Sequence, residues 1–313
     1  MADLSHGDRD RGQLLLVAAL AIAVAIVALV VLLNTSIYME NLATRDTDTG
    51  ASEAIAFRNT VEENLWRVVA AENDRTYASR STLEGNVSNR TDRFVALTAG
   101  RYRRSGAVAE LSNTTFHDGT RLRQTDPTRE FTSASGAANW TLATSADGVR
   151  EFEVNVTGGL TTTATPQSDA FGVNVDGSGG NRWSLYAYND GGGERIAVKN
   201  GTGPVNTNVC SGLYTQDPRV NLTAGTVNGT ACPAIDFARG TSAPYDVSYQ
   251  YGNRSTGTYR LTVNTSNVGN VNGPGPTTSP YRVPVVYSVT TDVVYRSPTL
   301  AYRANVTVQK GGA

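Results

Sequence analysis

The sequence predicts an α+β protein, in which an N-terminal transmembrane helix extends into an amphipathic helix and is followed by a β-rich, antiparallel, sandwich-like extracellular head. Three observations predict this class. Residues 14–33 contain only Leu, Val, Ile and Ala. Apolar residues recur every three or four positions over 54–68, which is the period of an amphipathic helix. From residue 149 onward, short runs alternate between apolar and polar residues and are separated by Gly, Asn and Pro, which is typical of antiparallel strands.

The apolar run is long enough to cross a membrane. Its twenty residues form a helix of roughly 30 Å, which matches the hydrocarbon thickness of a bilayer. Fourteen of them are Leu, Ile or Val, so insertion is favourable by about 4 to 8 kcal/mol. The alternative is a cleaved secretory signal peptide, whose apolar region usually has about 7 to 15 residues and ends at small residues. The run is longer and lacks such a site, so we predict a transmembrane helix over 13–36.

The sequence after this helix favours an extracellular position. Arg9 and Arg11 are offset by Asp8 and Asp10, so the charge asymmetry is weak. Eleven N-x-S/T sequons follow, roughly two to three times the chance number, and such sites are glycosylated only on the outer face. We therefore predict a single-pass protein of the cell membrane with its N-terminus inside and its C-terminal bulk outside. The candidate N-glycosylation sites are Asn86, Asn89, Asn113, Asn139, Asn155, Asn200, Asn221, Asn228, Asn253, Asn264 and Asn305.

Alanines within the apolar run share one side of the predicted helix. Ala18, Ala21, Ala25 and Ala28 recur at spacings of three, four and three. Small residues in line allow a second helix to approach closely in lipid. The alternative is that alanine is simply a common filler in membrane helices. The pattern therefore gives a candidate helix-packing face and does not decide between these two interpretations.

The start of the chain resembles a known signal. A charged leader that ends DRDRG, then Gln13 and an unbroken apolar helix, resembles the class III signal of archaeal type IV pilins and archaellins. Residues 11–45 together with NWTLATSADGVREFEVNVT at 139–157 are similar to haloarchaeal type IV pilin-like membrane proteins. The resemblance implies a cytoplasmic leader over 1–12 and prepilin cleavage between Gly12 and Gln13. The formal net charge of −1 departs from the strongly acidic composition of most halophile proteins.

The next segments predict a stalk over 37–78 and a mixed region of helix and loop over 79–148. The polar run at 45–50 predicts a break or bend in the helix. The amphipathic helix beyond it would lay its apolar face either on the head or against a second copy of itself. Within the mixed region, the pattern predicts a short helix over 92–102.

The β-rich domain is expected over 149–313. Its clearest hairpin joins 183–188 with 194–199 across a glycine-rich turn at 189–193, where glycine permits positive φ values. Further strands are expected over 152–156, 171–175, 247–251, 258–264, 281–290, 293–296 and 300–308. The Pro/Gly-rich stretch at 272–280 predicts an exposed loop between two of these strands, and the alternative is a linker between subdomains. Many short strands at this spacing indicate an antiparallel sandwich.

Cys210 and Cys232 are the two cysteines of the chain. Outside the cell they are expected to form a disulfide, which would stabilise the fold by about 3 kcal/mol. The alternative is a pair of free buried thiols.

Sequence motifs for catalysis or metal binding are missing. The two histidines, His6 and His117, form no H-E-x-x-H motif and no Ser-His-Asp arrangement. The segment 46–50 begins like a calcium loop, but Phe57 occupies the place of the closing glutamate. Arg101, Arg103 and Arg104 form a small basic group, interpreted as a solvated surface rather than a site for an acidic partner. We predict no catalytic, cofactor-binding or metal-binding residue and no cofactor.

Two functions are compatible with these features. The first is a pilin-like cell-surface protein with a structural, filament-associated or adhesive role. Its partners would be the membrane and other pilin-like subunits or envelope glycoproteins, contacted through the transmembrane and stalk helices. Nucleic acid is disfavoured as a partner by the charge balance and the location. The alternative is a membrane-anchored extracellular enzyme that acts on envelope glycans or peptides.

Overall fold

The computed structural model describes residues 7–213, 217–275 and 278–309, with side chains omitted at 7–16 and 35–49. The helices are α1 (Gly7–Asn73), α2 (Arg80–Arg104), α3 (Pro166–Asp169) and the 3₁₀ helix η1 (Gly252–Arg254). The strands are β1 (Val108–Gln124), β2 (Trp140–Ala146), β3 (Val149–Gly158), β4 (Phe171–Gly177), β5 (Arg182–Asn189), β6 (Glu194–Asn200), β7 (Val205–Asn206), β8 (Arg219–Asn221), β9 (Thr226–Val227), β10 (Thr230–Ala231), β11 (Tyr245–Gln250), β12 (Thr256–Val263), β13 (Tyr281–Arg296) and β14 (Ala301–Val308).

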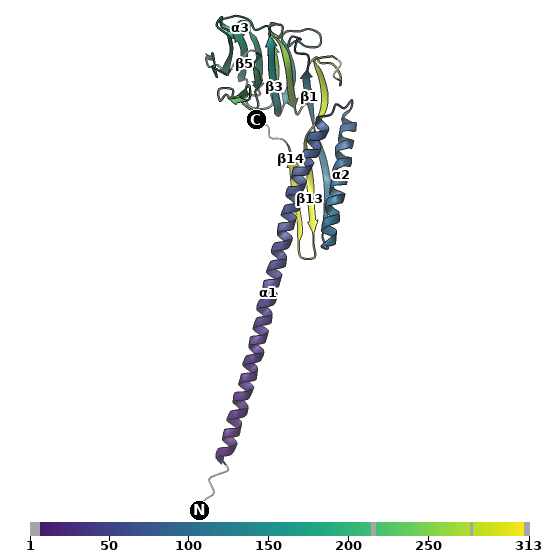
Figure 1. Ribbon diagram of the computed structural model, residues 1–313, viewed down its shortest axis with the longest axis vertical. Coiled ribbons are helices and arrows are strands. Elements are labelled where there is room, and N and C mark those ends of the chain that lie inside the picture. Colours follow the sequence, from purple (N-terminus) through teal and green to yellow (C-terminus); the bar gives the residue numbers. More distant parts are fainter. Residues whose placement is uncertain (1–6, 214–216, 276–277, 310–313) are drawn as a thin grey trace, which may run out of the picture.

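Helix α1 is a single helix of 67 residues that projects far beyond the rest of the molecule (Figure 1). The break predicted at 45–50 is wrong, because the helix continues through this polar run. Propagating an existing helix adds one hydrogen bond for each residue fixed, so a few weak helix formers are tolerated. The end of the run is also packed: Gly50 is buried, and a Cβ built there would lie 3.7 Å from the Cβ of Leu300, between β13 and β14.

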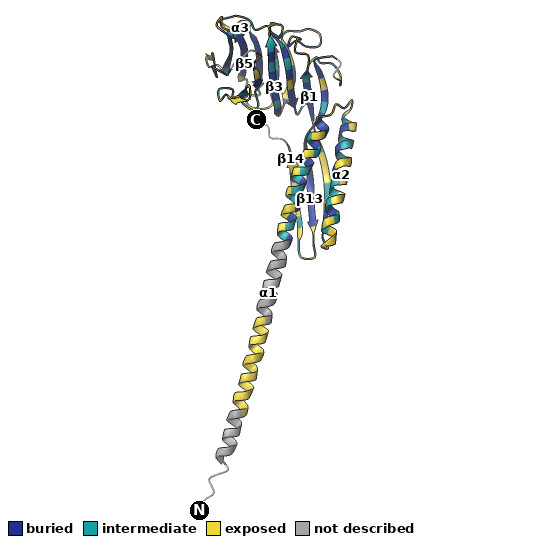
Figure 2. Cartoon of the chain, in the orientation of Figure 1, coloured by how far each residue is buried: buried dark blue, intermediate teal, exposed yellow. Residues whose placement is uncertain are grey.

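The C-terminal half of α1 is amphipathic and packs on the head, as one of the two sequence interpretations predicted (Figure 2). Its inward face consists of Ala54, Phe57, Val61, Leu65 and Val69, all at most 1% exposed. These side chains join a buried cluster with residues of α2, β1, β13 and β14. The helix is therefore held by side-chain packing along about four turns.

Helix α2 is longer than the predicted segment 92–102. It begins after Ser79, whose Oγ accepts a hydrogen bond from the backbone N–H of Thr82 at 3.2 Å. This N-cap satisfies one of the free N–H groups of the first turn. The region 79–148 is also richer in strand than predicted, because it contains the 17-residue strand β1 and the strand β2.

The strands form two antiparallel sheets. One has eight strands in the order β10-β9-β8-β3-β12-β1-β13-β14, and the other has six in the order β2-β11-β4-β5-β6-β7. The predicted hairpin is confirmed, since β5 pairs with β6 from Trp183↔Asn200 to Asn189↔Glu194. The stretch at 272–280 connects β12 to β13, as expected of a loop.

Strands β1 and β13 are long enough to serve two parts of the molecule. The first half of β1 and the last half of β13 extend away from the other strands (Figure 1). Together with β14 they form a three-stranded lower sheet beside α1 and α2. The opposite ends of the same strands belong to the upper part of this eight-stranded sheet, called the upper sheet below, where β1 pairs with β12 and β13 pairs with β1. The two parts are thus joined by continuous backbone.

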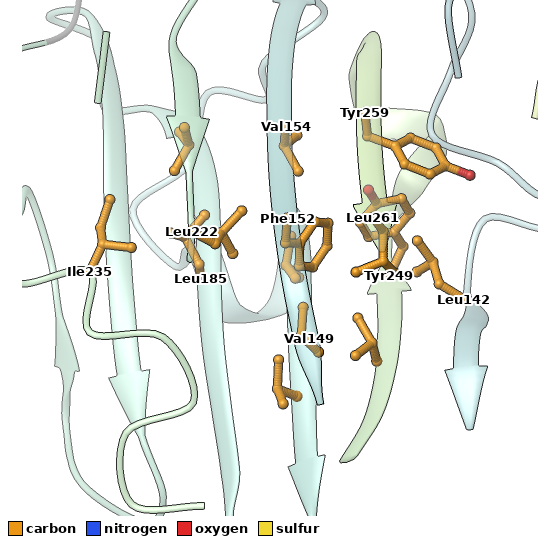
Figure 3. Close-up of a cluster of buried hydrophobic side chains, with 14 of the residues drawn as sticks. Leu142, Val149, Phe152, Val154, Leu185, Leu222, Ile235, Tyr249, Tyr259 and Leu261 are labelled. Atoms are coloured by element: carbon orange, nitrogen blue, oxygen red, sulfur yellow. The ribbon is translucent and has the colours of Figure 1, made fainter. Parts of the chain in front are cut away.

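The two largest buried clusters follow this division. The upper cluster draws side chains from both sheets and includes the residues in Figure 3. At its centre Tyr249 makes edge contacts with Phe171 and Tyr259 at centroid distances of 5.2 and 5.4 Å. The lower cluster lies between the two helices and the lower sheet. Helix α1 belongs to the lower cluster and ends where the upper one begins.

Candidate functional site

The exposed apolar part of α1 is the most distinctive surface of the molecule. Within the described residues, Val17–Asn34 is the one helical segment long and apolar enough to cross a membrane. Its large apolar side chains are more than half exposed, from 54% at Leu33 to 70% at Leu32 (Figure 2). A continuous exposed apolar surface of this size is unusual for a protein in water and indicates an interaction with lipid or another apolar partner.

The four alanines of the candidate packing face lie on this segment. Ala18, Ala21, Ala25 and Ala28 are all exposed, and their spacing places them on one side of the helix. Gly12 and Gln13, the candidate cleavage positions, fall within α1, where only the backbone is described. Cleavage there stays a prediction.

The end of α1 is fixed to α2 by a buried carboxylate. Glu72 has no exposed surface, and its Oε1 lies 2.6 Å from Nε of Arg90 on α2. The hydroxyl of Tyr77, in the connection between the helices, donates to the other oxygen. This hydrogen bond is the main reason that the pKa of Tyr77 is raised. A charge-assisted pair of this kind holds the two helices together at their junction.

The next residue fixes α1 to the sheet. Asn73 donates from Nδ2 to the carbonyl of Val286 at 2.8 Å and accepts its N–H at 2.9 Å. Val286 lies on β13 beside a register shift in the β1–β13 pairing, and the amide acts there as an extra strand partner. Arg121 of β1 donates to the carbonyl of Asn73 at 2.8 Å. The sequence pattern gave no signal for these contacts.

The outer face of the lower sheet carries a polar cluster around Asp292. Its carboxylate accepts hydrogen bonds from Arg303 at 2.6 Å, Asn113 at 2.8 Å and Asn305 at 3.0 Å. These donors, Arg303 first, hold the pKa of Asp292 well below its usual range. Asn113 and Asn305, two of the predicted glycosylation sites, therefore both donate to the carboxylate of Asp292 on the face opposite the helices.

The predicted glycosylation sites all lie at or near the surface. Seven are exposed: Asn89, Asn113, Asn139, Asn200, Asn228, Asn253 and Asn305. Four are half-buried: Asn86, Asn155, Asn221 and Asn264. The sites extend from α2 to β14 and thus over both parts of the head. Access is therefore compatible with modification, and the sugar itself stays a prediction.

The predicted disulfide is confirmed. Cys210 and Cys232 are bonded, with their Cα atoms 5.7 Å apart, and they are separated by 22 positions in the sequence. Cys232 is fully buried in the upper cluster. The bond encloses the short strands β8, β9 and β10, which contribute little sheet pairing of their own. The cross-link thus stabilises a part of the head that is poor in regular structure.

The remaining polar candidates have ordinary surroundings. His117 is exposed, and its Nε2 lies 3.1 Å from the hydroxyl of Thr290. Arg101, Arg103 and Arg104 are exposed in the last turn of α2, where positive charge is favoured by the helix dipole. No group of three or more His, Cys, Asp or Glu suited to a metal ion occurs among the described residues.

The chain is similar to one family over its N-terminal part. A family described as a family of unknown function (DUF7261) matches residues 8–152, a little less than half of the chain. The match covers α1, α2, β1, β2 and the start of β3. No curated protein and no solved structure matches the sequence. The similarity therefore comprises the apolar helix, the helical hairpin and the first long strand of the lower sheet.

Proposed function

We propose that this is a single-pass membrane protein with a structural, filament-associated or adhesive role at the cell surface, pilin-like in build. The supporting observation is the continuity of α1. One uninterrupted helix exposes an apolar surface in its N-terminal half and packs into the head with its C-terminal half. Such a helix fixes the position of the head relative to the membrane.

The length of α1 sets the distance between membrane and head. With Val17–Asn34 in the bilayer, residues 35–50 hold the packed part of the helix roughly 24 Å from the membrane surface. The N-terminus lies inside and the head outside, in keeping with the disulfide and the surface position of the sequons. The shared upper cluster supports a sandwich-like packing of the two sheets in the head.

Lateral assembly would use the part of α1 that the head leaves uncovered. The alanine face lets a second apolar helix approach closely in the membrane. Other pilin-like subunits or envelope glycoproteins are the proposed partners. Cleavage after Gly12 would leave Gln13 as the first residue of the assembled form.

The test combines extraction with a mass measurement. Cells that make the full chain are lysed, and the membrane fraction is washed with high salt and then treated with detergent. We expect the protein to leave the membrane only with detergent, and the mature N-terminus to be Gln13. A protein that begins at Met1 and extracts only as a monomer would exclude the filament subunit, and a protein in the soluble fraction would exclude the anchor.

The alanine face has its own test. Ala21→Leu and Ala25→Leu, made together, are expected to reduce cross-linking between neighbouring copies in the membrane. The matched control is Leu20→Ile with Val24→Leu, which changes the same segment without adding bulk to the alanine face. Equal cross-linking in both double variants would show that the four alanines are filler residues and do not form a packing face.

A further inference from the structure

A small cavity lies at the joint between α1 and the upper sheet. Its volume is about 100 Å³, well above the roughly 10 to 15 Å³ that one water requires. The last turns of α1 contribute Trp66, the residue after its end contributes Asp74, β1 contributes Arg121, and β3 contributes Arg150 and Glu151. The cavity is only partly enclosed, so a small solute can enter it.

Arg150 is a buried cation that lacks a counter-charge. The residue is 9% exposed, and its Nε has no hydrogen-bond partner among the described residues. The adjacent Glu151 pairs with Arg121 and Arg260 instead. The guanidinium stacks on Tyr287, 4.0 Å from the ring centroid, and lies 5.9 Å from that of Trp66. Ring contacts offset only part of the cost of burying a charge. The Nε donor of this guanidinium is therefore left without an oxygen ligand.

Arg121 is a second cation on the same cavity. Its Nη1 donates to the carbonyl of Asn73 at 2.8 Å and its Nε to Thr262 Oγ1 at 3.2 Å. Its carboxylate neighbours are more distant, with Glu151 at 3.8 Å and Asp74 at 3.9 Å. Burial lowers the pKa of Arg150, and the charge of Arg121 lowers it further.

The two carboxylates that line the cavity leave the charge of Arg150 unpaired. Glu151 already binds Arg260 at 3.1 Å, and the side chain of Asp74 is 79% exposed, so its charge is largely screened by water. The cavity lining thus holds two arginines and two carboxylates, and because Glu151 pairs with Arg121 and Arg260, the charge of Arg150 is left without a partner. Water can supply hydrogen bonds here but cannot neutralise that charge.

We propose that this cavity binds a small oxyanion, a sulfate, phosphate or free carboxylate, held by the guanidinium groups of Arg150 and Arg121. A guanidinium presents parallel N–H donors whose spacing matches two oxygens of such an anion. The bound anion would connect the last turns of α1 with β1 and β3. This site goes beyond the proposed surface role and does not depend on it.

The experiment measures the thermal unfolding temperature of the full chain in detergent micelles. Potassium sulfate, phosphate and acetate are each titrated against potassium chloride at matched ionic strength. At least one oxyanion is expected to raise the unfolding temperature in a saturable way, because a ligand of the folded state stabilises it by mass action. The salt whose effect saturates at the lowest concentration contains the preferred anion. Equal responses to all four salts would overturn the proposal.

Two further results locate the site. Arg150→Gln is expected to abolish the oxyanion-specific shift, while Arg296→Gln, at an exposed arginine of β13, retains it. A shift that survives in the Arg150 variant would overturn the assignment. Because that variant could fail to fold, the wild-type chain is also crystallised with selenate, whose selenium scatters anomalously. A peak in the cavity supports the site, and selenate bound only elsewhere contradicts it.

Discussion

Substitution of Asn73 by alanine tests whether α1 is firmly joined to the head. Asn73 is 6% exposed and its partner Val286 only 1%, so water cannot easily replace the lost amide. The change removes the hydrogen bonds of 2.8 and 2.9 Å and leaves the N–H and C=O of Val286 unpaired. An unsatisfied buried polar group costs about 1 to 3 kcal/mol. For two such groups with partial relaxation, we expect a loss of about 2 to 4 kcal/mol in the free energy of unfolding.

The assay is chemical denaturation of the full chain in micelles, followed by tryptophan fluorescence, since Trp66 lies two turns before Asn73 on α1. Asn59→Ala is the matched control, because Asn59 is an exposed asparagine on the same helix. The control is expected to change the free energy of unfolding by less than about 0.5 kcal/mol. A loss for Asn73→Ala that equals the control would refute the view that this amide joins helix and sheet.

Three further predictions concern other parts of the head. Replacing Cys210 and Cys232 by alanine should lower the free energy of unfolding by about 3 kcal/mol, from the loop of 22 positions, and an unchanged denaturation midpoint would argue against it. Ser79→Ala should cost about 1 kcal/mol through loss of the α2 N-cap, and a gain in helicity by circular dichroism would contradict this. The pKa of Asp292 is lower in the folded chain than in the unfolded chain, so the unfolded chain binds a proton at Asp292 more readily than the folded chain does. Its contribution to stability is therefore complete above the ordinary pKa of 3.8 and is lost as the pH falls below that value. Asp292→Asn should flatten this acid limb in unfolding curves recorded between about pH 2 and 5, and an unaltered limb would assign the acid sensitivity to other carboxylates.

Much of the fold follows from local sequence patterns. The repeat of apolar residues at 54–68 predicted the buried face of α1, because the 3.6-residue period places them on one side. The glycines at 191–193 predicted the β5–β6 hairpin, and Gly191 and Gly193 do adopt positive φ values of 90° and 153°. The disulfide followed from two cysteines and the expected compartment.

The missed elements have weak local patterns. Strand β1 is interrupted by two register shifts, between Ser112 and Thr115 and between His117 and Asp118, so its alternation is broken. The first half of α2 is rich in Ser, Thr and Asn. The side chains of such residues can hydrogen-bond to nearby backbone groups in non-helical conformations, so the local pattern favours a helix only weakly. Tertiary pairing and packing decide these segments.

The joint between α1 and the head could not be predicted from local sequence. The amide of Asn73 and the backbone of Val286 are 213 positions apart, and Arg150 meets Tyr287 from a different strand. Neither residue type signals such a contact, because Asn at a helix end and Arg on a strand are usually solvated. Only the three-dimensional arrangement brings them together.

The central claim is that α1 lies in the membrane with the head held outside the cell. Protease digestion of intact cells, followed by mass spectrometry of the membrane fraction, tests it most directly. The account predicts that the head is removed from intact cells and that a membrane-bound fragment containing Val17–Asn34 remains protected. A head that resists the protease until the cells are opened, or a fragment that leaves the membrane without detergent, would contradict the account.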